Sequence, residues 1–395
     1  MQTGFGAFVT VYLVENLWPP QAIGLALTVA TMSSLLSQIP AGAALDSMRD
    51  KRGAVLLGIA GVGLAALLLC VTAVRGAVYL ALAVQGLASS LIGPGIAAIS
   101  LALVGRAALS ERIGRNARFA AIGNGLAAGV MGVAGSYQPA ATSVFLVAAV
   151  LALPALLSLS LIGGEGAERA VPQPLPSDQQ RQGDAPITWQ GMKSLLLDKR
   201  LAIFAACVVL FFAAGAAIGP VVAARVTRRW PDFATLIIAA TILLPQAIVA
   251  AISPWIGRRA DRSGRRPLLL LGWGLLPVQG FLYAALPGVF ALVLGNLLNA
   301  VSGAIFGVTM TVVAADLTRR TGCFNLTLGA LGVAISVGAS LSTFFTGISA
   351  ALFGARMAVL GLALVGLCGL LLLWASMPET REHHIVPDES DPAEV

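Results

Sequence analysis

Residues 54–74 read AVLLGIAGVGLAALLLCVTAV, an apolar run without a charged side chain. The hydrocarbon core of a bilayer is about 30 Å thick, so a helix needs about 20 apolar residues to cross it. Inside hydrocarbon only a helix or a closed barrel satisfies every backbone polar group, and barrel strands would alternate polar and apolar residues. This stretch therefore predicts a transmembrane helix.

The same pattern continues along the chain. Further apolar runs occupy residues 3–17, 22–45, 77–104, 119–136, 140–162, 201–224, 233–256, 268–286, 288–313, 324–349 and 357–376. Only 11% of the 395 residues are charged, against roughly 25% in a soluble domain, so too few charges remain for a water-facing surface. We predict an all-α membrane protein of about twelve transmembrane helices. The first run is shorter than a full span, so we expect helix 1 to be incomplete at this start.

Basic residues are unevenly divided between the connections. Of the 25 lysines and arginines, 20 fall in one set of alternate connections and 5 in the other set. By the positive-inside rule the rich set faces the cytoplasm, which predicts a bacterial inner-membrane protein with both termini cytoplasmic. The net charge of +7 then reflects topology. A nucleic-acid partner is not expected, because that would need basic residues gathered on one face among aromatics.

A polar segment divides the runs into two sets of six. It includes PQPLPSDQQRQGDAP at residues 172–186 and is typical of a flexible linker. We predict an N-terminal six-helix half at 1–162, a cytoplasmic linker at 163–200, a C-terminal half at 201–376 and a cytoplasmic tail at 377–395. Within the linker, residues 189–197 are expected to form a short interfacial helix.

Related motifs follow the second run of each half: GAALDSMRDKR (42–52) and GRRADRSGRR (257–266). The later copy fits the spacing G-x-x-x-D-R-x-G-R-[RK] with Gly257, Asp261, Arg262, Gly264, Arg265 and Arg266. The earlier copy keeps Gly42, Asp46, Lys51 and Arg52 but departs from the pattern at Ser47 and Arg49. A second related pair, ERIGRNARF (111–119) and DLTRRTGCF (316–324), follows the fourth run of each half. We interpret both pairs as loops produced by an internal duplication.

In these motifs the chain resembles the major facilitator superfamily over nearly its whole length. The resemblance implies two pseudo-symmetric six-helix bundles with a substrate site between them. It also implies that the aspartate loops act as a latch controlling conformational change. Possible latch partners are Glu111, Arg112, Arg115, Arg118, Asp316, Arg319 and Arg320. The alternative is that these arginines are ordinary positive-inside anchors.

Two shorter matches are less complete. Gln85 and Gly86 resemble the end of the R-x-x-Q-G motif of proton-coupled members, but Leu82 stands at the arginine position. Pro378, Glu379 and Thr380 resemble the P-E-T that follows the last span of sugar-type members.

Polar side chains inside spans are costly and are therefore candidates for the substrate cavity. Glu15 is the one carboxylate within a predicted span, so it is a candidate to bind a cation or cycle a proton; the alternative is an interfacial glutamate. Arg225 is a candidate contact for an anionic substrate, or an outer-interface arginine. The amides that complete this set are Gln38, Gln85, Asn124, Gln246, Gln279, Asn296 and Asn299.

Several function classes are disfavoured. The sequence has no HExxH, GxSxG or P-loop motif, so we do not expect an enzyme. We expect no cofactor or metal, because the four cysteines lack CxxC spacing and both histidines lie in the polar tail. We predict a monomeric secondary transporter that works by alternating access and exports small organic compounds in exchange for protons. The alternatives are an uptake symporter or facilitator for a polar metabolite, such as a sugar or organic acid, and a membrane protein that binds without transporting.

Overall fold

The computed structural model describes residues 9–10, 12–48, 50–134, 140–161, 198–218, 234–286, 288–319, 321–377 and 379. These residues form helices and turns, with no strand among them. Residues 12–15 are helical, and the helices that follow are α2 (Pro20–Ser47), α3 (Lys51–Val71), α4 (Arg75–Val104), α5 (Leu109–Ala134), α6 (Ala140–Ser160), α10 (Lys199–Gly215), α12 (Ala234–Ser263), α13 (Arg266–Ala285), α14 (Val289–Leu317), α15 (Phe324–Phe353) and α16 (Ala355–Ser376). Eight of these helices are long and apolar enough to cross a bilayer, which confirms the predicted all-α membrane fold.

Most helices begin and end close to the predicted runs, but α5 and α12 are longer. Helix α5 begins at Leu109, ten residues before its apolar run, and α12 ends at Ser263, seven residues after its run. Hydropathy marks where a helix leaves hydrocarbon, whereas its backbone hydrogen bonds continue into water through good helix formers such as arginine and glutamate. The prediction that these motifs are loops was therefore wrong for residues 42–47, 111–118 and 257–263, which lie on helices, whereas residues 264–265 and 321–323 lie outside the helices.

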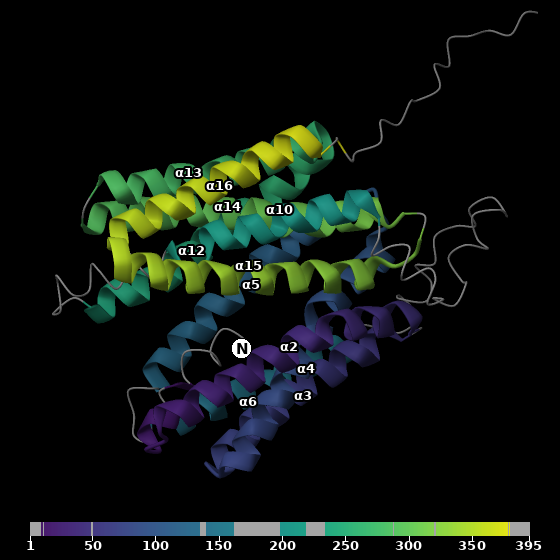
Figure 1. The fold of residues 1–395 in the computed structure, drawn as a ribbon. Coiled ribbons are helices and arrows are strands. Elements are labelled where there is room, and N and C mark those ends of the chain that lie inside the picture. The colour runs from purple at the N-terminus through teal and green to yellow at the C-terminus, as the bar shows by residue number, and fades with distance from the viewer. Residues whose placement is uncertain are drawn as a thin grey trace, which may run out of the picture.

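The helices form two bundles that Figure 1 shows one above the other. In the N-terminal bundle α3 packs against α4 and α6, and α2 packs against α4. In the C-terminal bundle α13 packs against α14 and α16, and α10 packs against α15 and α16. Between the bundles, α2 contacts α15 and α5 contacts α12. These four helices make most of the contacts at the boundary between the two halves.

The apolar cores show where the halves are joined. We call the end that carries residues 42–52 and 257–266 the motif end. There Leu109 and Ile113 of α5 share one core with Ile256 and Ala260 of α12. Toward the other end each half has a core of its own. The N-terminal one includes Tyr12, Leu69 and Phe145, and the C-terminal one includes Ile218, Tyr283 and Leu362. The described residues thus form a molecule that is closed at the motif end.

Candidate functional site: the seam between the halves

Two glycines let α2 and α15 approach each other at the motif end. A Cβ at Gly42 would overlap the carbonyl oxygen of Asn325 and would lie 2.9 Å from the Cα of Leu326. A Cβ at Gly329 would in turn overlap the carbonyl oxygen of Gln38. The neighbouring atoms are backbone, which cannot swing aside as a side chain can. Only glycine fits at these positions while the halves are closed.

Asp46 lies one turn beyond Gly42 and caps a helix of the other half. Its carboxylate accepts hydrogen bonds from the backbone N–H of Asn325 (2.9 Å), the Asn325 side-chain amide (2.7 Å) and the backbone N–H of Leu326 (2.8 Å). Helix α15 begins at Phe324, so these N–H groups belong to its first turn and have no partner within the helix. The positive end of the helix dipole also favours an anion there. The Asp46 carboxylate therefore ties the N-terminal half to the C-terminal half.

Gln38 extends the seam inward from Gly42. Its side-chain amide donates to Ser336 Oγ of α15 at 3.2 Å, and its Oε1 lies against Gly332. The residues Gln38, Gly42 and Asp46 are spaced four apart and so share one face of α2. The structure places Gln38, predicted as a cavity residue, in this seam.

A related seam joins α5 to α12. A Cβ at Gly257 would overlap the carbonyl oxygen of Ser110, and a Cβ at Gly114 would overlap that of Ser253. Each residue has a counterpart in the first seam whose number differs by 215. The counterparts of Gly257, Ser110, Gly114 and Ser253 are Gly42, Asn325, Gly329 and Gln38, in that order. The internal duplication is thus visible in the close backbone contacts of both seams.

Among the described residues, the second seam has no counterpart of the carboxylate cap that Asp46 gives the first. Asp261, the counterpart of Asp46, pairs within its own half with Arg265 at 4.0 Å. The counterpart of Leu326 is Glu111, whose carboxylate is 2.7 Å from Arg115. A second carboxylate at the start of α5 would meet the negative charge of Glu111, which accounts for the difference between the seams. The motif copy at 42–52, which departs further from the family pattern, therefore supplies the carboxylate that joins the two halves.

Arg265 is buried and connects Asp261 to the end of α14. Its Nε lies 3.2 Å from Asp316 Oδ2, and its terminal nitrogen donates to the carbonyl oxygen of Ala260 at 3.2 Å. Asp316 was predicted as a latch partner, and the structure brings it to Asp261 through this arginine. Both carboxylates belong to the C-terminal half, so this network holds the helix ends of that half together.

Glu379 supplies a helix cap that sequence reasoning did not assign. Its carboxylate accepts hydrogen bonds from the backbone N–H of Arg265 (2.9 Å) and of Arg266 (3.0 Å), at the start of α13. Gly264 has φ +88°, and a Cβ there would lie 2.5 Å from Glu379 Oε2. The motif glycine is thus required both for the turn and for the approach of this carboxylate. The P-E-T resemblance was the available signal, but it did not reveal this partner.

We expect Glu379→Ala to lower the thermal stability of the purified protein. Loss of a carboxylate from a helix N-terminus typically costs about 1 kcal/mol. Glu379→Gln keeps one acceptor oxygen and should fall between the alanine variant and the wild type. Unfolding midpoints in detergent measure the effect, and equal midpoints for the alanine variant and the wild type would contradict this role.

The last arginine of each motif makes an equivalent contact in its own half. Arg52 donates to the carbonyl oxygen of Ser160 at the end of α6, and Arg266 donates to that of Trp374 near the end of α16, at 2.7 Å. Lys51 begins α3, and the Asp50 carboxylate caps that helix by accepting from the backbone N–H of Gly53 at 2.9 Å. Each of these contacts joins residues of the same half.

Arg106 makes a further contact between the halves that sequence reasoning missed. It lies in the turn between α4 and α5 and donates to the carbonyl oxygen of Ala315 in α14. Burial lowers the pKa of the Arg106 guanidinium, the charge of Arg319 lowers it further, and Asp316 opposes the shift. A single arginine in a short connection gave no sequence signal of its own.

The remaining candidates are spread over both halves. Gln85 donates to Ser89 within α4 at 3.0 Å, and Gln279 is buried beside Tyr283 in the C-terminal bundle. Asn124 and Gln246 are half-buried on α5 and α12, whereas α14 carries a buried Asn296 and a half-buried Asn299. Arg112 is half-buried and Arg319 is exposed. Arg225, Arg320 and most of the predicted linker lie outside the described residues.

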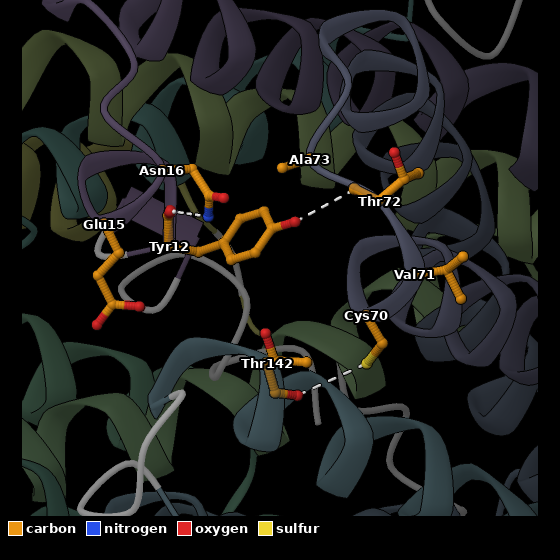
Figure 2. A pocket seen from close by; sticks show the side chains of 8 residues that line it. All are labelled: Tyr12, Glu15, Asn16, Cys70, Val71, Thr72, Ala73 and Thr142. Atoms are coloured by element: carbon orange, nitrogen blue, oxygen red, sulfur yellow. Dashed lines mark hydrogen bonds between the residues drawn. The ribbon is translucent and has the colours of Figure 1, made fainter.

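Glu15 lines a pocket of about 550 Å³ at the end opposite the motifs. The lining also includes Tyr12, Asn16, Cys70, Val71, Thr72, Ala73 and Thr142, all from the N-terminal half (Figure 2). The Tyr12 hydroxyl donates to the Thr72 carbonyl oxygen at 3.2 Å, which holds the tyrosine ring against the end of α3. Glu15 is exposed. The structure therefore places it beside α3 and α6 and not at the seam.

Comparison with known proteins gives a consistent result. A family model described as Major Facilitator Superfamily matches residues 1–253 and 231–394. An uncharacterised MFS-type transporter of Mycobacterium tuberculosis, in strains H37Rv and CDC 1551, is 33% identical over 387 residues, which cover 98% of this chain and 91% of the relative. The class B tetracycline resistance protein of Escherichia coli is 31% identical over 110 residues, 27% of each chain. Among solved structures, the proton:xylose symporter XylE superposes with a TM-score of 0.72 at 15% identity, over 96% of this chain and 93% of that one.

Proposed function

Because this chain belongs to the major facilitator superfamily and is a secondary transporter, we propose that it exports small organic compounds from the cytoplasm in exchange for protons. The moving bodies in this proposal are the halves at 1–162 and 201–376, joined by the linker at 163–200 and followed by a tail at 377–395. The transporter acts as a monomer, since the two halves of one chain enclose the substrate path.

The observation that carries the proposal is the closed seam at the motif end. Alternating access requires two arrangements of the halves, each closed at one end. The contacts of Asp46 and of Gly42 with α15 join two rigid bundles, whereas the cores toward the other end are separate. The excess of lysine and arginine supports a cytoplasmic motif end. In this orientation the structure corresponds to the state that faces outward.

Two features favour export of amphipathic compounds over uptake of a polar metabolite. The first is the similarity of part of the chain to a tetracycline resistance protein. The second is that two of the seven candidate amides are used within the protein, because Gln38 bonds across the seam and Gln85 bonds within α4. Fewer amides then remain to replace the water around a sugar.

We expect ion coupling to depend on Glu15. In proteoliposomes with an imposed proton gradient, the wild type should move a tetracycline-type amphipathic compound against its gradient, and a protonophore should abolish this movement. Glu15→Gln should stop gradient-driven movement while exchange of the compound at equilibrium continues, because binding persists without a titrating group. Unchanged accumulation by Glu15→Gln would exclude this glutamate as the coupling group. Uptake of xylose or an organic acid in place of export would favour the uptake alternative.

A further inference from the structure

Helices α5 and α12 meet at the boundary between the halves, and the pair has one buried flank and one open flank. They meet along Gly114 and Gly257, whose neighbours are backbone atoms of the opposite helix. On one flank Ile113 and Ile256 are buried in the same apolar core. The two helices are antiparallel and of the same hand, so residues displaced equally from the contact line lie on the same side of the pair.

The open flank carries arginines from both halves. Arg115 is 59% exposed, and Arg118, Arg258 and Arg262 are also exposed. Arg118 Nε donates to the carbonyl oxygen of Ala250 at 2.9 Å, which holds its guanidinium against the opposite helix. The arginines of the open flank thus come from both halves.

The same flank becomes apolar with distance from the motif end. Phe119 is 70% exposed and Trp255 is 53% exposed next to the arginines, and the exposed apolar residues Ile122, Leu126 and Leu243 follow deeper along the helices. The order of arginine, aromatic ring and aliphatic side chain follows the profile of a membrane leaflet from headgroup to acyl chain. A lipid whose headgroup lay beside the arginines would place its acyl chain along the aliphatic part.

The charges of this flank favour an anion. Glu111 offsets one arginine by pairing with Arg115 at 2.7 Å, and Asp261 is directed to the buried Arg265. Guanidinium groups bind phosphate oxygens in a bidentate manner and keep their charge at any physiological pH. Among the residues that the structure describes, no carboxylate lies within ion-pair distance of Arg118 or Arg258, so these two arginines add net positive charge to the flank.

We propose that Arg118 and Arg258, with Arg115 beside them, bind the phosphate headgroup of an anionic glycerophospholipid of the cytoplasmic leaflet, with Phe119 and Trp255 beside its glycerol region. The site rests on the cytoplasmic orientation proposed above for the motif end. Because its arginines come from both halves, a bound lipid bridges the seam between α5 and α12. In the seam between α2 and α15, the Asp46 carboxylate ties the two halves together. In the seam between α5 and α12, the lipid phosphate would have this role.

Native mass spectrometry of the full-length protein in detergent tests the site without a transport assay. Phosphatidylglycerol should bind the wild type more tightly than phosphatidylcholine. Arg118→Gln combined with Arg258→Gln should weaken phosphatidylglycerol binding roughly tenfold to thirtyfold, since each arginine near a membrane surface contributes about 1 kcal/mol. The control combines Arg75→Gln with Arg356→Gln, which removes the same charge from exposed arginines at the other end.

Equal weakening in both variants would overturn the proposal, because it would show that only net charge matters. Displacement of the lipid by millimolar inorganic phosphate would also overturn it, since the site would then hold a soluble anion. If the glutamine variant fails to fold, Arg118→Lys combined with Arg258→Lys takes its place. This variant keeps the charge and should retain most of the phosphatidylglycerol binding. The lipid-binding measurement uses no transport substrate, so it is independent of the transport assay. Lipid binding by a protein that does not transport would support this site and contradict the proposed export function.

Discussion

Gly42→Ala is expected to remove most transport activity and to leave the motif end open. The added methyl group would overlap the Asn325 carbonyl oxygen, and helix backbone has no rotamer by which to move away. To relieve this overlap, the two halves must separate by a fraction of an ångström along the whole seam. That separation also withdraws Asp46 from the first turn of α15.

Gly24→Ala provides a matched control on the same helix. A Cβ at Gly24 would have no neighbour within 4 Å, so this variant changes helix propensity equally and leaves the seam intact. Transport by Gly24→Ala should therefore equal that of the wild type. Full transport by Gly42→Ala would show that the close approach of α2 to α15 is not needed during the cycle.

Cys323 reports the state of the seam in these variants. It is buried at the start of α15, and both burial and the nearby charge of Asp46 raise the pKa of its thiol. Alkylation requires the thiolate, so the closed seam protects Cys323 by low access and by a low thiolate fraction. With Cys70, Cys207 and Cys368 replaced, maleimide labelling should be faster in Gly42→Ala than in Gly24→Ala.

Asp46→Asn is expected to shift the balance of states toward an open motif end. Asparagine offers one acceptor oxygen where aspartate offers two, and it carries no charge for the N-terminus of α15. Hydrogen bonds to a charged group contribute roughly 1.5–3 kcal/mol, which corresponds to roughly tenfold to a hundredfold in the ratio of closed to open molecules. Net transport should fall because one of the two states becomes scarce.

Distances between spin labels measure this shift without relying on thiol reactivity, which the loss of the Asp46 charge would itself change. In a background without native cysteines, labels at Ser47 and Thr321, both exposed at the motif end, span the seam. The control is Asp50→Asn, which removes a carboxylate that caps α3 within its own half. A distance distribution that is the same for Asp46→Asn and Asp50→Asn would reduce Asp46 to a surface charge.

The amino-acid sequence alone determined the class of fold and the family. Apolar length is a local property set by bilayer thickness, so runs such as 54–74 predicted helices that the structure contains. The spacing of the motif at 257–266 identified the major facilitator superfamily, and the duplication that it indicated reappears in the paired glycine contacts. Hydropathy gave the wrong limits where helices α5 and α12 continue into water, because a helix needs backbone hydrogen bonds and not apolar side chains.

Only the tertiary structure decided what each motif residue contacts. Asp46, in the copy that departs further from the family pattern, caps a helix that begins 278 residues later, whereas Asp261 remains within its own half. Arg106, Asn325 and Glu379 gained their roles through partners that are distant in sequence. A buried carboxylate needs a helix N-terminus or a guanidinium to compensate for its lost hydration. The way the two halves dock decides which of these groups lies nearest to it.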